Sequence, residues 1–324
     1  MKIQLATPAA PGTLNGNGVL AERWAGFLDE LGHRVEITNP TTVGEADLLI
    51  AVHAKRSARA IVGQAAANPR CPIVVILAGT DIYGAVQKKD GETLRSIDAA
   101  DLLVTLQPLA SRELGRDTAA KVRVVFQSAV ASPLTTKPCT DRFDIAMVGN
   151  IRRLKGQLTV IAALDLLPAR SKARVLHAGS VLEPELGARL RAESRSGARY
   201  RWLGSLGHEQ TKRLIAGCHL LVHPSRREGG ANVIGEAVVA GVPVLASRIP
   251  GSVGLLGTGY PGYFPTGDAR RLAELISLVE NDEWHCSRLR GYCRRLAAQF
   301  DHAAEREAIR RVIEEATERG AGAA

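Results

Sequence analysis

The strongest constraint on the fold is an alternation of short apolar runs with amphipathic segments, and this alternation occurs twice along the chain. In the first half we interpret the apolar runs as strands, at residues 2–9, 34–38, 46–53, 71–80, 100–106 and 121–128. Apolar residues at helical spacing predict helices at residues 19–32, 57–67, 89–98 and 108–115. Strands that alternate with helices are typical of an α/β domain with a mainly parallel sheet.

The alternation restarts after residues 135–143, where Pro, Thr and charged residues indicate a linker. The second series of predicted strands covers residues 143–150, 174–180, 200–205, 218–225 and 242–247. The second series of predicted helices covers residues 156–167, 183–195, 207–216 and 232–240. We therefore expect two tandem, doubly wound Rossmann-like domains, the first over residues 1–136 and the second over residues 137–300.

The last residues, 301–324, are predicted to form a C-terminal helix and tail that pack back toward the N-terminal domain. The charged helical stretch extends over roughly 283–318, and the small-residue tail at 320–324 is expected to be disordered. Ligands of doubly wound sheets bind beyond the carboxyl ends of the strands, so two such domains in tandem predict an interdomain cleft that holds the ligands.

Composition limits the partners that the chain can have. With 45% hydrophobic and 23% charged residues, the chain has the composition of a soluble globular protein. Its formal net charge of +9 would suit nucleic acid, an anionic membrane surface or small anionic substrates. Aromatic residues make up only 4% of the chain, and no zinc-finger, RNP or heptad pattern is present, so we expect no nucleic-acid partner.

Neither a disulfide framework nor a metal site is predicted. The five cysteines form no C-x-x-C pair. His219 and His223 are four residues apart, but a strand would separate them by roughly 13 Å, which is too far for a shared zinc ion. His53 and His177 lie at the ends of predicted strands, where either could hydrogen-bond a ligand.

We expect a cytoplasmic protein with no integral membrane segment. Residues 1–9 contain no signal-peptide core, and no apolar run is long enough to cross a bilayer. At most, the protein would bind peripherally to a membrane through its basic surface.

The segment EGGANVIGEAVVAGVPVLAS, residues 228–247, carries the first indication of function. Glu228 lies on the loop after a predicted strand, and Glu236 lies one turn inside the helix that begins near Asn232. Because helical side chains lean toward the N-terminus, both carboxylates should face the same helix mouth. A capping box does not account for them, because it would need Glu at Gly235. An acid favoured by the helix dipole remains the simpler alternative, worth less than about 1 kcal/mol.

The loop between the two glutamates offers free backbone amides to an anion, from Gly229, Gly230, Ala231 and Asn232. Carboxylates would repel a phosphate, but they can accept hydrogen bonds from neutral hydroxyls beside it, such as those of a ribose and of a sugar. The pattern therefore predicts a nucleotide-sugar site.

This segment resembles the donor site of GT-B glycosyltransferases of the family 4 type. The resemblance implies that Glu228 binds the donor sugar, that Glu236 binds the ribose hydroxyls, and that the backbone between them contacts sugar and diphosphate.

A second donor signature of that family resembles GNIRRLKG, residues 149–156, in which Lys155 and Gly156 match. Asn150 stands where the family usually has Arg, so Arg152 or Arg153 must supply the second cation for the diphosphate. The alternative for both arginines is a solvated loop. No D-x-D sequence occurs, so we expect a metal-independent enzyme without a cofactor.

Further segments resemble the selenosugar synthases of selenoneine biosynthesis. They are residues 15–35, 53–58, 77–85, 105–110, 124–129, 177–180, 199–206 and 259–276. The resemblance implies that the protein joins selenophosphate to the sugar of UDP-N-acetylglucosamine, forms a carbon–selenium bond and releases UDP.

The predicted acceptor site lies at strand ends of the first domain, where Lys55, Arg56 and Thr80 offer two cations and a hydroxyl to an anion. Asp81 is the predicted general base, although it could instead hold Lys55 or Arg56, or cap the following turn. A selenium nucleophile arrives deprotonated and needs no strong base.

The loop Asn15–Gly18 follows the first strand, and the resemblance implies that it reaches the acceptor or the donor phosphate through Asn17. A plain loop is the alternative. Two rival functions also remain: a glycosyltransferase acting on a sugar or lipid hydroxyl, and a non-catalytic nucleotide-binding protein.

Overall fold

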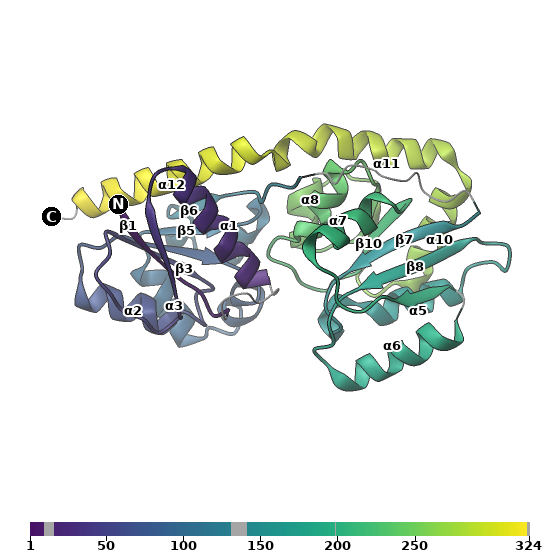
Figure 1. Ribbon diagram of the computed structural model, residues 1–324, viewed down its shortest axis with the longest axis horizontal. Helices are drawn as coiled ribbons and strands as arrows, with labels where there is room; N and C mark the ends of the chain where they lie inside the picture. Colours follow the sequence, from purple (N-terminus) through teal and green to yellow (C-terminus); the bar gives the residue numbers. More distant parts are fainter. Residues whose placement is uncertain (10–15, 131–140, 198, 323–324) are drawn as a thin grey trace. The chain divides into compact units, whose positions relative to one another are not determined.

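The computed structural model describes residues 1–9, 16–130, 141–197 and 199–322. The chain divides into two compact units (Figure 1), of which the first comprises Met1–Gln127 with His302–Ala324 and the second comprises Ser128–Asp301. The domain boundary expected between residues 136 and 137 falls outside the described residues, as does most of the linker expected at 135–143, so both stay predictions.

The first unit is built on a six-stranded parallel sheet in the order β2-β1-β3-β4-β5-β6. Its strands are β1 Lys2–Ala6, β2 Arg34–Thr38, β3 Leu48–Val52, β4 Ile73–Leu77, β5 Leu102–Thr105 and β6 Val122–Val124. Every residue of β3 and β4 is buried, as the continuous apolar runs of a sheet covered on both faces require.

Helices cover this sheet in two layers. They are α1 Gly16–Glu30, α2 Ala58–Ala67, the π-helix η1 Asp81–Val86, α3 Gly91–Ala99, the 3-10 helix η2 Pro108–Glu113, α4 Arg116–Ala119 and α12 His302–Gly322. On one face, Trp24 of α1 and Ile309 of α12 share a core with strand residues such as Ile50. On the other face, Ile61 of α2 and Ile97 of α3 pack against the sheet.

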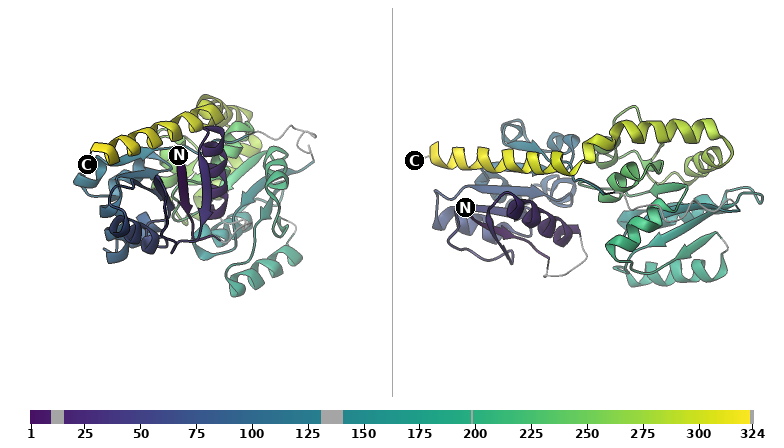
Figure 2. Two further views of the ribbon diagram at one scale, coloured as in Figure 1. Left: turned by 60° about the vertical axis from the view of Figure 1, so that its left-hand side comes forward. Right: turned by 45° about the horizontal axis from the view of Figure 1, so that its top comes forward.

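The C-terminal helix α12 is therefore part of the first unit. It lies along the unit beside α1 (Figure 2), and Arg23 of α1 forms an ion pair of 2.8 Å with Glu305. Apolar residues of α12 at helical spacing, Ile309, Val312, Ile313 and Ala316, are buried in the core.

The second unit has its own six-stranded parallel sheet, in the order β12-β11-β10-β7-β8-β9. Its strands are β7 Phe143–Val148, β8 Ala173–Ala178, β9 Tyr200–Trp202, β10 Leu220–His223, β11 Val244–Ser247 and β12 Tyr263–Phe264. The strand order reverses between β7 and β10. Doubly wound sheets bind their ligands at such a reversal, beyond the carboxyl ends of the two strands.

The helices of the second unit are η3 Arg153–Lys155, α5 Gln157–Asp165, α6 Pro184–Ser196, α7 His208–Ala216, α8 Asn232–Val239, α9 Pro250–Leu256, α10 Ala269–Asn281, α11 Glu283–Leu296 and η4 Ala297–Phe300. Helices α5 and α6 lie on one side of the sheet, and α7 and α8 on the other (Figure 1).

Three expectations about the fold need correction. The charged stretch 283–318 is not one helix, because the extended backbone at Asp301 separates η4 from α12. Residues 16–18 form the first turn of α1 rather than a loop, and Asn15 lies outside the described residues. Residues 320–322 of the tail are helical.

None of the helices in the described part of the chain is both long enough and apolar enough to span a bilayer. The cysteines that the structure describes are buried free thiols: Cys71, Cys218, Cys286 and Cys293.

Candidate functional site

A partly buried ion pair lies at the strand reversal of the second unit. Lys155 follows β7, Glu228 follows β10, and these two strands are neighbours in the sheet. The distance from Lys155 Nζ to Glu228 Oε1 is 2.5 Å, and the side chains are 25% and 14% exposed. The structure thus brings together two residues that the sequence predicted for one site.

Glycines allow the loops around this pair to approach one another. Gly156 has the left-handed φ of +72°, and a Cβ there would lie 2.2 Å from the carbonyl oxygen of Pro224. A Cβ on Gly251, in α9, would lie 2.3 Å from the carbonyl oxygen of Glu228. Larger residues at either position would push the loop of Lys155 or the helix α9 away from the loop of Glu228.

The electrostatic balance keeps Glu228 ionised. Burial raises the pKa of the Glu228 carboxyl, but Lys155, His223 and a hydrogen bond from Ser225 together hold this pKa below its ordinary value. His223, at the end of β10, lies with Nε2 3.7 Å from Glu228 Oε1. Burial lowers the pKa of His223 to about 4, so its imidazole is neutral at physiological pH.

Several polar groups around Glu228 have no hydrogen-bond partner within the residues that the structure describes. They are His223 Nε2, Asn232 Oδ1 and the amides of Gly229, Gly230 and Ala231. These amides precede α8, whose N-terminus adds a positive dipole end. Buried polar groups in native proteins are nearly always satisfied, so unpaired ones beside a charged pair indicate the position of a ligand.

Glu236 lies in the second turn of α8 with its carboxylate 3.7 Å from His208 Nδ1, at the start of α7. Its side chain is mostly buried. His208 was not among the residues predicted from the sequence. The sequence could have indicated it, because His208 is the first residue of α7, which follows strand β9.

The two arginines of the β7 loop have different surroundings. Arg153 is highly exposed, with Nε 3.7 Å from Glu183, and its amide donates to the same carboxylate. Arg152 is half-buried, and its guanidinium has no hydrogen bond or ion pair to any described residue. Arg152 is therefore the cation available to an anionic ligand.

Asn150, which stands at the usual Arg position, has a structural role. Its Oδ1 accepts a hydrogen bond of 3.1 Å from the amide of Ser180 and so joins the ends of β7 and β8. His177 is also structural: its Nε2 donates to the carbonyl of Gly149, and Tyr200 donates to its Nδ1. Because His177 is fully buried and both nitrogens are occupied, the expectation that it could hydrogen-bond a ligand is corrected.

In the first unit, Asp81 is fully buried and accepts four backbone hydrogen bonds. The donors are the amides of Ala54, Ala78, Gly79 and Ile82, at 2.7–3.1 Å. A carboxylate in this position ties the end of β3 to the end of β4 and cannot reach a substrate. The predicted role of Asp81 as a general base is therefore corrected, and we assign it as a positioning residue.

Lys55 and Arg56 follow Ala54, whose amide donates to Asp81, and Thr80 directly precedes Asp81. Lys55 donates to Asp90 at 2.6 Å, and this bond raises the pKa of Lys55 and lowers that of Asp90 to about 2. Arg56 is exposed and has no side-chain partner in the described part of the chain. Thr80 is exposed, and its hydroxyl lies 2.9 Å from Nε2 of His53. Asn17 lies in the first turn of α1.

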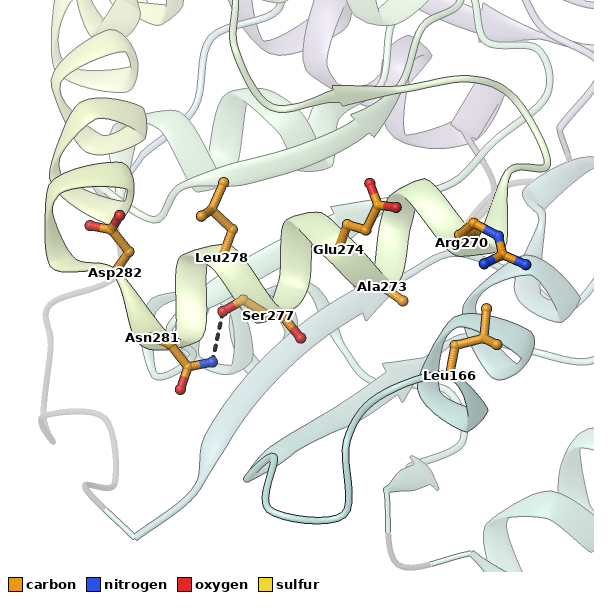
Figure 3. Close-up of a pocket in the computed structure, with 8 residues that line it drawn as sticks. All are labelled: Leu166, Arg270, Ala273, Glu274, Ser277, Leu278, Asn281 and Asp282. Atoms are coloured by element: carbon orange, nitrogen blue, oxygen red, sulfur yellow. Dashed lines mark hydrogen bonds between the residues drawn. The ribbon is translucent and has the colours of Figure 1, made fainter.

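A pocket on the second unit lies away from the Lys155–Glu228 pair. It runs along α10 and includes Leu166, just after α5, and Asp282 (Figure 3). Its remaining lining residues, Arg270, Ala273, Glu274, Ser277, Leu278 and Asn281, all belong to α10, so it contains none of the predicted site residues. We assign no role to this pocket.

Comparison with known proteins gives the same picture of the fold. Residues 136–296 match the family described as glycosyl transferases group 1. The structure is similar to that of HepE from Anabaena in complex with UDP-glucose, with a TM-score of 0.75 and 20% identity over 97% of this chain and 99% of that chain. It is also similar to sucrose-phosphate synthase from Thermosynechococcus elongatus, with a TM-score of 0.80 and 17% identity over 97% and 98% of the two chains.

A third similar structure is the pneumococcal O-GlcNAc transferase GtfA in complex with UDP and GlcNAc. Here the TM-score is 0.64 at 14% identity, and the match covers 91% of this chain and 60% of that chain. At these identities the likeness shows the fold, which is the expected GT-B fold of two Rossmann-like units.

Proposed function

We propose that the chain is a glycosyltransferase that joins selenophosphate to the sugar of UDP-N-acetylglucosamine, because its fold is GT-B and its residues 136–296 match the group 1 glycosyl transferases. In this reaction the selenium atom attacks the anomeric carbon and forms the carbon–selenium bond. The bond from this carbon to the diphosphate oxygen breaks, and its electron pair leaves with UDP.

The donor would occupy the carboxyl ends of β7 and β10. Glu228 would accept hydrogen bonds from the sugar hydroxyls, and Glu236 would accept them from the ribose. The loop of Gly229, Gly230 and Ala231 with Asn232 would donate its amides to sugar and diphosphate. Support for a UDP-sugar comes from HepE and the pneumococcal transferase, whose structures hold UDP-glucose and UDP with GlcNAc.

Lys155 and Arg152 would stabilise the negative charge that develops on the leaving diphosphate. Charge stabilisation of this kind is commonly the largest contribution to catalysis, and no D-x-D sequence is present to recruit a metal for it. Within the described residues no three His, Cys, Asp or Glu side chains gather to hold a metal ion. We propose that Lys155 and Arg152 take the place of a metal ion in stabilising the diphosphate.

The observation that carries the donor assignment is the Lys155–Glu228 pair at the strand reversal. Each side chain can leave the ion pair and bind the ligand instead, since Lys155 can bind a phosphate oxygen and Glu228 can bind a sugar hydroxyl. A nucleotide sugar offers both groups a few bonds apart.

The acceptor assignment to Lys55, Arg56 and Thr80 rests on the resemblance of the sequence and on the surroundings of Asp81. A hydroxyl acceptor gains from a general base, and the one carboxylate predicted for that role is occupied by four backbone amides. Selenophosphate needs no base, because its selenium is already deprotonated.

The test is anaerobic incubation of the full chain with UDP-N-acetylglucosamine and fresh selenophosphate, with mass spectrometry of the products. The proposal predicts a sugar with the selenium isotope pattern and an equal amount of UDP. UDP without a selenium-containing sugar would keep the donor site and remove selenophosphate as the acceptor. An absence of UDP with selenophosphate and with sugar or lipid hydroxyl acceptors would instead favour a non-catalytic nucleotide-binding protein.

A further inference from the structure

His53 has an unusual backbone conformation at the predicted acceptor site. It follows β3 directly, is only 4% exposed and has a φ of +73°. Residues other than Gly seldom adopt this left-handed backbone conformation, and residues that do so are concentrated at functional sites. The strand order of the first unit reverses between β1 and β3, so His53 lies where doubly wound sheets bind ligands.

The hydrogen bonds of His53 define which ring nitrogen carries the proton. The amide of Arg56 donates to Nδ1 at 3.3 Å, so Nδ1 is unprotonated. In the neutral ring the proton is then on Nε2, which lies 2.9 Å from the hydroxyl oxygen of Thr80 and must donate to it.

Three charged groups, Asp81, Arg56 and Lys55, influence the ring. Asp81 approaches Nδ1 to 3.7 Å, which is too long for a hydrogen bond, and its oxygens are already occupied by amides. Burial lowers the pKa of His53, and the cations of Arg56 and Lys55 lower it further, against the opposing effect of Asp81. The ring is therefore neutral at physiological pH.

The donation from His53 decides what Thr80 can do. The hydroxyl oxygen accepts the Nε2 proton, so the hydroxyl hydrogen must point away from the ring. Thr80 is exposed, and its hydrogen is thus available to a ligand. A hydroxyl that is held as a donor beside Arg56 suits an oxygen that carries negative charge.

We infer that His53 is a positioning residue that holds Thr80 as a hydrogen-bond donor to an oxyanion of the acceptor. This inference deepens the proposed function and rests on it for the identity of the acceptor, which is a small tetrahedral oxyanion.

Two substitutions of His53 separate this role from a merely structural one. Asn tolerates a positive φ, and its Oδ1 can accept the Arg56 amide as Nδ1 does, but its side chain is too short to reach Thr80. Gln can place an N–H near the position of Nε2 and so restores the donation. We expect His53→Asn to raise the KM for selenophosphate about ten-fold or more, the effect of losing one hydrogen bond to a charged group.

We further expect His53→Gln to recover most of this loss and both variants to keep the KM for UDP-N-acetylglucosamine. Thr80→Val should raise the KM for selenophosphate as His53→Asn does. The double variant should be no worse than Thr80→Val alone, because both substitutions remove the same contact. Independent, multiplicative effects in the double variant would overturn the inference, as would an unchanged KM in His53→Asn.

Calorimetric titration with inorganic phosphate, on protein saturated with UDP, separates this inference from the proposed function. Phosphate affinity in the order wild type, then His53→Gln, then His53→Asn would support the inference even if no selenosugar forms. If selenosugar forms but neither phosphate affinity nor KM responds to His53→Asn, the proposed function stands and the inference fails.

Discussion

Two carboxylates, one in each unit, occupy comparable places beyond strand ends but have opposite surroundings. Glu228 in the second unit faces one lysine and several polar groups without partners in the described residues. Asp81 in the first unit accepts four backbone amides. A carboxylate with an exchangeable partner can bind a ligand, whereas a carboxylate saturated by the backbone holds the fold. Residue type and position at a strand end did not distinguish these two roles.

The largest effect is expected from removing the saturated carboxylate. Asp81→Ala would leave four backbone amides without their acceptor, and three of these hydrogen bonds are buried. We expect the substitution to lower the free energy of unfolding by about 3 kcal/mol or more. Urea unfolding measures this change. Glu228→Gln is the matched control and should cost clearly less than Asp81→Ala, because an amide of equal size still accepts from Lys155, whose ammonium is partly exposed. Equal losses in the two variants would remove the distinction between the carboxylates.

Removing the exchangeable cation should affect turnover rather than folding. We expect Lys155→Ala to lower kcat about 100-fold or more, the usual effect of deleting a group that stabilises transition-state charge. Thermal unfolding should stay near that of the wild type. A normal kcat in Lys155→Ala would count decisively against its role on the diphosphate.

The ribose contact should appear as a change in affinity. Glu236→Gln is expected to weaken UDP binding about ten-fold, since a charged hydrogen-bond acceptor becomes a neutral one. Calorimetric titration with UDP gives the affinity. Glu209→Gln, an exposed acid on the neighbouring helix α7 that pairs with Lys212, should leave the affinity unchanged.

The smallest effect should distinguish the two arginines of the β7 loop. Arg152→Ala is expected to lower kcat/KM about ten-fold, because this guanidinium has no partner among the described residues and can bind the diphosphate. Arg153→Ala should change it less than about two-fold, because Arg153 is exposed and directed to Glu183. The reverse order would mean that the loop rearranges when the donor binds.

Much of the fold follows from the sequence, because both series of strands are apolar runs with clear periodicity. The tight turns of the donor loops also left a sequence signal in Gly156 and in the Gly-Gly pair at 229 and 230. The break at Asp301 could not be foreseen from helical periodicity. It depends on tertiary packing, since Phe300 is buried against Gly235 of α8.

The site was predictable only in part, for a similar reason. Glu228 and Lys155 belong to contiguous motifs, so the sequence could assign them to one site. The partners of Asp81 are backbone amides of two separate loops, which no residue pattern encodes. His223 and His53 acquire their roles from neighbours 5 and 27 residues away along the chain, Glu228 and Thr80.

The most direct test of the distinction between the two carboxylates is a crystal structure with UDP-N-acetylglucosamine bound and no acceptor. We predict that Lys155 Nζ leaves Glu228 for a phosphate oxygen, that Glu228 accepts from a sugar hydroxyl, and that Asp81 keeps its four amides. A bound donor beside an intact Lys155–Glu228 pair would contradict this account.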